Sequence, residues 1–189
     1  MRIGILGLQG DVAEHAAIVK KLADEVVIVK RAPELETIDG LIIPGGESTT
    51  IGKLIVKYGI DKEIKRKKNA IFGTCAGAIL LAKEIVAAQQ FSMKLADIVV
   101  ERNAYGRQKE SFEADLQIPV LGKTLFRGVF IRAPVIRRVG KSVEVLAEYD
   151  GAPVLARQGN LLVSTFHPEL TTDYRLHEYF IRLTESISK

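Results

Sequence analysis

The sequence predicts an α/β fold built on an open, mostly parallel sheet with helices on both faces and antiparallel additions in the C-terminal half. Two observations lead to this prediction. In the N-terminal half, short apolar runs rich in β-branched residues alternate with stretches of helical periodicity. From about residue 95, strand-like runs follow one another closely without helical stretches between them. The expected arrangement is flavodoxin-like, and with 189 residues and no repeat or linker we expect one domain over residues 1–189.

The first strand and the first helix are indicated by the opening residues. RIGILGL at 2–8 is typical of a buried strand. Asp11 is a good N-cap for the next helix, because Glu14 stands three residues later, as in a capping box. Apolar residues then recur at helical spacing, namely Val12, Ala16, Val19 and Ala23.

The rest of the N-terminal half repeats this alternation. Strands are expected at VVIVK (26–30), GLIIP (40–44) and AIFGT (70–74), with helices from about Ser48 to Tyr58 and from just after Cys75. Glycine-rich turns follow three of the strands, at Gly7–Gly10, Gly45–Thr49 and Gly73–Gly77. Sites in open α/β sheets lie beyond the C-terminal ends of the strands. We therefore expect these turns to form the floor of one pocket.

The C-terminal half is expected to add strands and one last helix. The strand-like runs are DIVVER (97–102), SFEADLQI (111–118), GVFIRAP (128–134), VEVLAEYD (143–150), APVLARQ (152–158) and NLLVSTF (160–166). Their close spacing is typical of antiparallel pairing and an extended edge. The last helix is predicted to be amphipathic, with an apolar stripe formed by Leu176, Tyr179, Phe180, Leu183 and Ile187.

Composition and charge indicate which partners and which cellular compartment to expect. The net charge is +4, but the basic residues are scattered, and the densest run, Lys65–Lys68, has Asp61 and Glu63 beside it. This run is typical of a solvated helix face, so we expect no nucleic acid partner. No zinc-ligand spacing indicates a metal, and no apolar run approaches the ~20 residues that cross a bilayer. The start does not resemble a signal peptide and one cysteine forbids an internal disulfide, so we expect a cytoplasmic protein without membrane contact.

The single cysteine lies in a turn that is typical of a nucleophile. Gly73-Thr74-Cys75-Ala76-Gly77 is the thiol form of the G-x-S-x-G elbow, which places the nucleophile on a strained strand-to-helix turn. Larger side chains at the two glycines would collide with the strand and the helix. The N-terminus of the next helix would stabilise a thiolate, and the Ala76 N–H is positioned to donate to an oxyanion. The alternative is a small buried cysteine in a glycine-rich turn.

His167 is the candidate base for this thiol. It ends the strand-like run 160–166, and Pro168 favours extended geometry at the histidine. Residues two apart in extended chain point the same way, so Glu169 is expected to orient the imidazole. His15 and His177 fall inside predicted helices, where an exposed or partly buried histidine without a role in chemistry is the ordinary interpretation.

A second oxyanion donor is predicted in 44-PGGESTT-50. Two glycines let backbone N–H groups face a ligand oxygen, so Gly46 together with Ala76 would form a two-donor hole. A phosphate nest and a simple turn are the alternatives. The segment lacks the lysine of a Walker A loop, which argues against nucleotide phosphate.

These elements in combination resemble the class I, triad-type glutamine amidotransferases. Further segments resemble the glutaminase subunits of pyridoxal 5′-phosphate synthase within that family. They are GLQGDVAEH (7–15), PGGESTT (44–50), IFGTCAG (71–77), ERNAYGRQ (101–108), SFEADL (111–116), GVFIRAP (128–134) and FHPEL (166–170). The resemblance runs from residue 2 to about residue 180. One departure is Lys94, because 91-FSMKLAD-97 has no glycine where the family often has one.

The resemblance implies a function and a set of site residues. Cys75 would attack the carboxamide of L-glutamine, His167 would transfer protons and Glu169 would orient His167, through a γ-glutamyl thioester and without a cofactor. The positions that match the family's glutamine-binding residues are Gly46, Glu47, Ser48, Arg102, Ile131 and Arg132. Ammonia would pass to a separate synthase (lyase) subunit in a large hetero-oligomer for vitamin B6 biosynthesis. In such proteins Gln9 would lie near the docking face and help to order the oxyanion hole.

Two other functions are compatible with parts of the sequence. One is a different cysteine-triad hydrolase or amidotransferase on the same fold, such as a γ-glutamyl hydrolase. The other is a non-catalytic, flavodoxin-like binding module with a redox-sensitive cysteine, which would leave His167 and Glu169 without a role. Glutamate release from glutamine, with and without a synthase partner, separates these functions from a glutaminase.

Overall fold

The computed structural model of the chain describes residues 1–86, 88–102 and 111–187. Its centre is a seven-stranded sheet in the order β10-β11-β12-β4-β3-β1-β2. The neighbours from β2 to β12 are parallel, and β10 and β11 are antiparallel additions at one edge. The strands are β1 (Arg2–Leu6), β2 (Glu25–Val29), β3 (Gly40–Ile43), β4 (Ala70–Thr74), β10 (Glu144–Tyr149), β11 (Ala152–Gln158) and β12 (Leu161–Ser164). The predicted fold class is confirmed.

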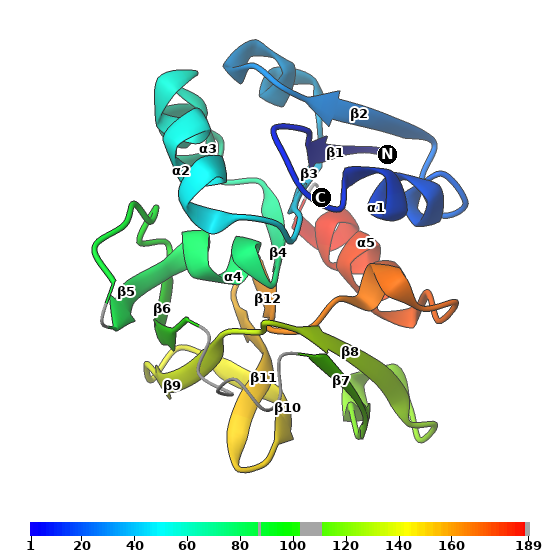
Figure 1. Ribbon diagram of the computed structural model, residues 1–189. Coiled ribbons are helices and arrows are strands. Elements are labelled where there is room, and N and C mark those ends of the chain that lie inside the picture. The colour runs from blue at the N-terminus through cyan, green and yellow to red at the C-terminus, as the bar shows by residue number, and fades with distance from the viewer. Residues whose placement is uncertain (87, 103–110, 188–189) are drawn as a thin grey trace.

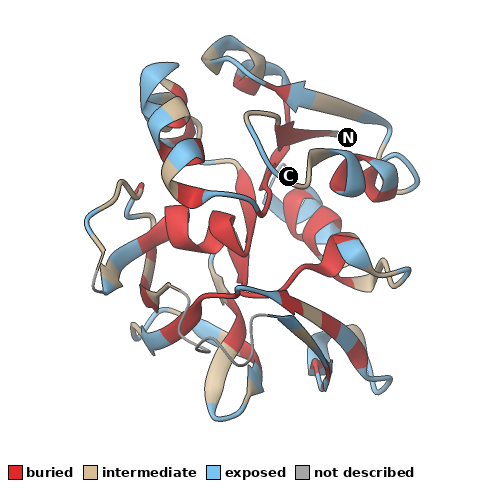
Figure 2. Cartoon of the chain, in the orientation of Figure 1, coloured by how far each residue is buried: buried red, intermediate tan, exposed pale blue. Residues whose placement is uncertain are grey.

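Helices cover both faces of this sheet. The helices α1 (Val12–Val19) and α5 (Arg175–Ile187) lie on one face, and α2 (Ser48–Lys57), α3 (Ile60–Lys67) and α4 (Ala76–Leu81) lie on the other (Figure 1). Strand residues alternate between the two cores, so that Leu41 and Ile43 pack with α2–α4 whereas Ile42 packs with α1 and α5. Figure 2 shows the resulting buried centre, in which β3 and β4 contain no exposed residue. This double burial explains why these strands are continuous apolar runs in the sequence.

Two smaller sheets complete the structure. One has the order β5 (Ala82–Val86), β6 (Ala96–Glu101) and β9 (Val135–Val139), and the other is the antiparallel pair β7 (Ser111–Leu116) and β8 (Phe126–Ile131). Short 3₁₀ helices are η1 (Ala32–Thr37), η3 (Pro119–Leu121) and η4 (Pro168–Leu170). The prediction gave no strand at β5 or β9. β5 begins directly after α4, so no turn signal separates the two, and β9 contains two arginines in its five residues.

Several local predictions can be compared with the structure. Lys65 and Arg66 are exposed, and Arg66 pairs with Glu63, which confirms a solvated helix face. The α5 stripe is only partly as predicted, because Ile187 is 45% exposed whereas His177 is fully buried. In the described ranges no helix is long and apolar enough to cross a membrane.

Lys94, where the resemblance fails, has a backbone conformation that suits glycine. Its φ is +57°, in the left-handed region where a side chain is strained. The neighbouring residues hold it there, because Met93 N donates to Leu80 O at 2.7 Å and Leu95 N donates to Leu81 O at 3.0 Å. The loop therefore keeps a turn that suits glycine although the glycine is absent.

The glycine-rich turns meet beyond the C-terminal ends of the parallel strands. A Cβ on Gly10, whose φ is +105°, would lie 1.7 Å from Gly45 O, so the first two turns touch backbone to backbone. Asp11 N donates to Gly45 O at 3.3 Å and fastens them further. This contact places Asp11, which follows Gly10, beside Gly45, which follows β3.

Candidate active site

Cys75 sits on a strained turn between β4 and α4. Its φ of 47° and ψ of −100° are unusual for a residue with a side chain. Cys75 N donates to Ser164 O at 2.9 Å, which ties the turn to β12. The glycines on either side are required by space, since a Cβ on Gly73 would lie 2.7 Å from the carbonyl carbon of Gly77 and a Cβ on Gly77 would lie 2.1 Å from Ile43 O. The local geometry is that of a nucleophile elbow.

His167 reaches the same place from the end of β12. Its backbone N donates to Val129 O at 2.8 Å, and its side chain is buried. His167 Nδ1 lies 2.7 Å from Glu169 Oε1, so the predicted pair is present. The predicted reason is wrong, however. Glu169 belongs to the 3₁₀ turn η4 rather than to extended chain, and the turn directs its carboxylate toward the His167 ring.

The thiol and the imidazole influence each other. Cys75 is one of the groups that raise the pKa of His167, and with Nδ1 facing Glu169 the ring has Nε2 left for the sulfur. Cys75 Sγ also lies 3.9 Å from Ile131 O, its acceptor at the end of β8. Residues 75 and 167, which are far apart in the sequence, therefore share one buried site.

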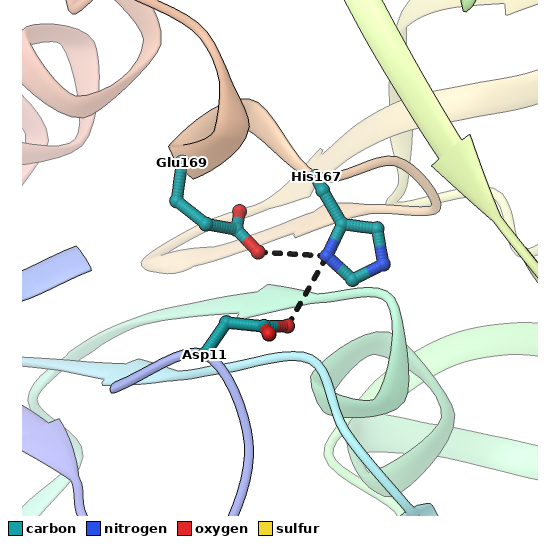
Figure 3. A group of neighbouring side chains, drawn as sticks. All are labelled: Asp11, His167 and Glu169. Carbon is teal, nitrogen blue, oxygen red and sulfur yellow. Dashed lines mark hydrogen bonds and ion pairs between the residues drawn. The ribbon is translucent and has the colours of Figure 1, made fainter. Parts of the chain in front are cut away.

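Asp11 is a second carboxylate at this histidine. Figure 3 shows Asp11 and Glu169 facing the same ring nitrogen, with Asp11 Oδ2 3.3 Å from His167 Nδ1. Asp11 does precede α1 at the N-cap position, but its side chain makes no capping hydrogen bond there. The hydrogen bond with His167 lowers the pKa of Asp11. Sequence analysis missed this role because an N-cap already accounted for the aspartate.

Two carboxylates and the thiol shift the titration of His167. Burial lowers the pKa of this imidazole, but interactions with Asp11, Cys75 and Glu169 outweigh burial and raise the pKa to about 12. Burial raises the pKa of Glu169, and its bond to His167 opposes that effect. At neutral pH His167 is therefore an imidazolium. Asp11, His167 and Glu169 have the composition of a metal site, and the Nδ1 proton of His167, which both carboxylates face, accounts for their clustering.

The sequence suggested that His15 and His177 are exposed or partly buried, and that prediction is wrong. Both are fully buried, and His15 Nδ1 lies 3.0 Å from His177 Nε2. His15 Nε2 lies 3.3 Å from Glu169 Oε2 and 3.2 Å from Thr74 Oγ1. Burial lowers the pKa of His15 well below its usual value and lowers that of His177 to about 4, so both rings are neutral near pH 7. Their spacing in the sequence gave no signal of this contact.

Three of the residues proposed for substrate binding, Glu47, Ser48 and Arg102, lie around one small polar cluster. Arg102 Nη2 is 3.7 Å from Glu47 Oε1, and Arg102 Nη1 donates to Gln90 Oε1 at 2.5 Å. Ser48 Oγ donates to the same Gln90 oxygen at 3.2 Å. Gln90 was missed in the sequence, where nothing distinguishes it from other loop glutamines. Residues 103–108 of the ERNAYGRQ segment lie outside the described residues.

Glu47 has a structural role that the sequence analysis did not predict. It occupies the N-cap of α2, where its carboxylate accepts from Thr49 N at 3.1 Å and Thr50 N at 2.6 Å. Hydrogen bonds from Thr49 and Thr50 lower the pKa of Glu47 to about 2. The carboxylate is therefore fixed and ionised at the edge of the site.

Gln9 and Gly46, from the first two glycine-rich turns, are in direct contact. Gln9 Oε1 accepts from Glu47 N at 2.8 Å, and a Cβ on Gly46 would lie 2.7 Å from that same oxygen. Gln9 is exposed, so a surface side chain holds this backbone. Ala76 opens α4 next to Cys75, and Arg132 follows β8 with a φ of +44°.

Comparison with known proteins gives consistent results. The model of the SNO glutamine amidotransferase family matches residues 5–186. "Pyridoxal 5'-phosphate synthase subunit PdxT" of Thermotoga petrophila is 52% identical over 188 residues, 98% of this chain and 100% of the relative. The protein of the same name from Thermus thermophilus is 54% identical over 186 residues, 96% of each chain.

Solved structures agree with this result. "Crystal structure of glutamine amidotransferase" describes a chain that is 53% identical, with a TM-score of 0.89 over 97% of this chain and 98% of that one. A glutamine amidotransferase from Thermotoga maritima shares the fold with a TM-score of 0.61 at 13% identity, covering 100% of this chain and 84% of that one. From the family match and the full-length similarities at about half identity, the chain belongs to the SNO glutamine amidotransferase family.

Proposed function

We propose that this protein is a glutaminase that hydrolyses L-glutamine to L-glutamate and ammonia and supplies the ammonia to a pyridoxal 5′-phosphate synthase subunit. The relatives at about half identity over their full length carry that synthase's name. One geometric observation supports the chemistry most strongly. A cysteine on a strained elbow and His167 are buried in one site, where the thiol helps to raise the pKa of the imidazole, and His167 Nδ1 lies 2.7 Å from Glu169 Oε1.

In the first half of the reaction, the Cys75 thiolate attacks the side-chain carbonyl carbon of glutamine. The carbonyl oxygen becomes an oxyanion, for which the N–H groups of Gly46 and Ala76 are the proposed donors, each contributing typically ~3 kcal/mol to the transition state. The tetrahedral intermediate collapses as the C–N bond breaks. His167 gives its proton to the leaving nitrogen, so ammonia departs and a γ-glutamyl thioester remains.

In the second half, water replaces the thiol. His167, now neutral, takes a proton from water as the oxygen attacks the thioester carbonyl. The C–S bond breaks, glutamate leaves and Cys75 returns as a thiolate beside the imidazolium. Glu169 stabilises that imidazolium throughout and keeps the ring in the required orientation.

Charged groups near the elbow fit the two ends of a free amino acid. Arg102 and Arg132 are proposed to bind the α-carboxylate, because guanidinium pairs well with carboxylate. Glu47, held ionised by its cap hydrogen bonds, is proposed to bind the α-ammonium. Ser48 and the Ile131 backbone complete the proposed pocket, and Ile131 O already lies 3.9 Å from Cys75 Sγ.

We further propose that the chain is a single-domain, cytoplasmic component of a large hetero-oligomer. Gln9 is the proposed contact at the synthase face, since this exposed side chain holds the backbone N of Glu47 next to the proposed oxyanion donor Gly46. A partner that moved Gln9 would change the backbone at that donor.

The test measures glutamate release from glutamine by the protein alone and with its synthase partner. Cys75→Ala is expected to abolish release in both states while leaving the melting temperature and the complex with the synthase unchanged. Ser92→Ala, an unrelated loop substitution, serves as the matched control. A folded wild-type protein that releases no glutamate in either state would overturn the proposal and favour a binding module.

A further inference from the structure

A chain of buried polar side chains continues behind Glu169. Glu169 Oε1 faces His167, and the second oxygen, Oε2, faces His15 at 3.3 Å. His15 comes from α1 and its neighbour His177 from α5, the two helices that cover this face of the sheet (Figure 1). Both imidazoles are fully buried, and neither takes part in the proposed reaction. The proposed reaction therefore does not explain why two histidines are buried here.

Hydrogen bonding decides which nitrogen of each ring carries the proton. His177 Nδ1 is buried without a partner among the described residues, so a proton there would be an N–H with no acceptor. Placing that proton on Nε2 lets His177 donate to His15 Nδ1 across the 3.0 Å contact. His15 then carries its own proton on Nε2, which faces Glu169 Oε2 and Thr74 Oγ1. The opposite assignment would direct a lone pair of His15 at the carboxylate.

Glu169 Oε2 needs this donor. It is buried and has no hydrogen-bond partner in the part of the chain that the structure describes, and His15 Nε2, 3.3 Å away, is the donor placed beside it. The other titratable groups that face this carboxylate are His167 and Asp11, which meet at the Oε1 side. Two further titratable groups influence Glu169 only through these residues. His177 contacts His15, and Cys75 interacts with His167.

We propose that His15 is a positioning residue of the glutaminase reaction, holding the outer oxygen of Glu169 through its Nε2–H, with His177 fixing the tautomer. The proposal rests on the proposed function. Its consequence is that Glu169 stays ionised and aimed at His167 down to a lower pH than it would alone, because a donor to the charged form stabilises that form.

The alternative is that the two imidazoles only fill space in the hydrophobic core, where Phe72 packs edge-on against His177. The two explanations differ in what a substitution changes. A space-filling role predicts a change in stability with an unaltered pH dependence. A positioning role predicts that loss of the donor raises the pKa of the acidic limb of kcat/KM, because Glu169 becomes protonated at a higher pH.

The experiment measures glutamate release against pH, in the presence of the synthase partner, for the wild-type protein and three variants. His15→Phe fills the space without a donor, and His15→Gln places an amide near the position of Nε2. His177→Phe removes the ring that fixes the tautomer. For His15→Phe we expect the midpoint of the acidic limb to rise by about one pH unit. At a pH on that limb, kcat/KM then falls on the order of tenfold. His15→Gln is expected to restore most of it, and His177→Phe to give a smaller shift.

A second measurement does not depend on turnover. Long-range ¹H–¹⁵N spectra of the wild-type protein report the tautomer of each ring, and we expect both His15 and His177 to be protonated at Nε2. An Nδ1-protonated His15, or a folded His15→Phe with an unmoved acidic limb, overturns the inference while leaving the glutaminase proposal intact. A wild-type protein that is inactive with its synthase partner overturns the proposed function instead, and the spectra still test the tautomers.

Discussion

The charge of Asp11 at His167 gives the sharpest prediction. In Asp11→Asn the side chain keeps its shape but loses its negative charge 3.3 Å from His167 Nδ1. At that distance one charge pair amounts to about 5 kcal/mol in an effective dielectric of ~20. The Asp11 side chain is 34% exposed, so solvent screens part of this and about 1.4–4 kcal/mol remains. That corresponds to a pKa change of about 1 to 3.

The sign follows from the protonated form that Asp11 stabilises. The carboxylate favours the imidazolium, so its removal lowers the pKa of His167 from about 12 to roughly 9–11. Glu169 and Cys75 remain, which is why the pKa stays above its ordinary value. In the mechanism, a lower pKa makes more of the neutral base available for hydrolysis of the thioester near pH 7.

Nuclear magnetic resonance of the histidine Cε1–H groups tests this directly. The chain has three histidines, and near pH 7 the wild-type spectrum should show one imidazolium, His167, and two neutral rings. Asp150→Asn is a suitable control, because it removes the same charge from the exposed turn between β10 and β11. An unchanged His167 midpoint in Asp11→Asn would refute the electrostatic reasoning.

Four further results are expected. Glu169→Gln should slow glutamate release by about 10²–10⁴-fold, measured at saturating glutamine, because the ring loses its orienting charge. Lys94→Gly should raise the free energy of unfolding by about 1 kcal/mol in urea titrations, since it relieves a left-handed lysine. Gly77→Ala should lower it by about 1–3 kcal/mol, because the new methyl group meets Ile43 O. For His177, the pKa of about 4 lies below the unfolded value of about 6.5, so stability present above pH 6.5 should fall by about 3 kcal/mol as the pH drops to 4, and His177→Phe should lack this loss.

What the sequence predicts well here is local. The parallel strands are continuous apolar runs because helices cover both faces, and the elbow is encoded in five consecutive residues around Cys75. His167 and Glu169 are two residues apart, so their pairing needs no knowledge of the fold. The missed β5 shows the limit, because its identity depends on pairing with β6 rather than on its own pattern.

The missed site residues have partners that are distant in the sequence. His15 and His177 are separated by 162 positions, and Ser48 and Gln90 by 42. Asp11 was assigned to the helix that follows it, whereas its partner lies at the far end of the chain. Such contacts depend on which loops the sheet order brings together, and propensity at a single position carries no information about that.

The sheet order also explains why one histidine is charged and two are neutral. Beyond the C-terminal ends of β1 and β12, loops bring Asp11 and Glu169 to the same side of His167, and two carboxylates outweigh the cost of burying its charge. His15 and His177 lie one layer deeper, between helix and sheet, where burial dominates. The carboxylate of Glu169 spans the two layers, with one oxygen toward the charged ring and the other toward the neutral pair. A change in the deeper layer therefore reaches His167 through Glu169, whereas a change at Asp11 acts on His167 directly.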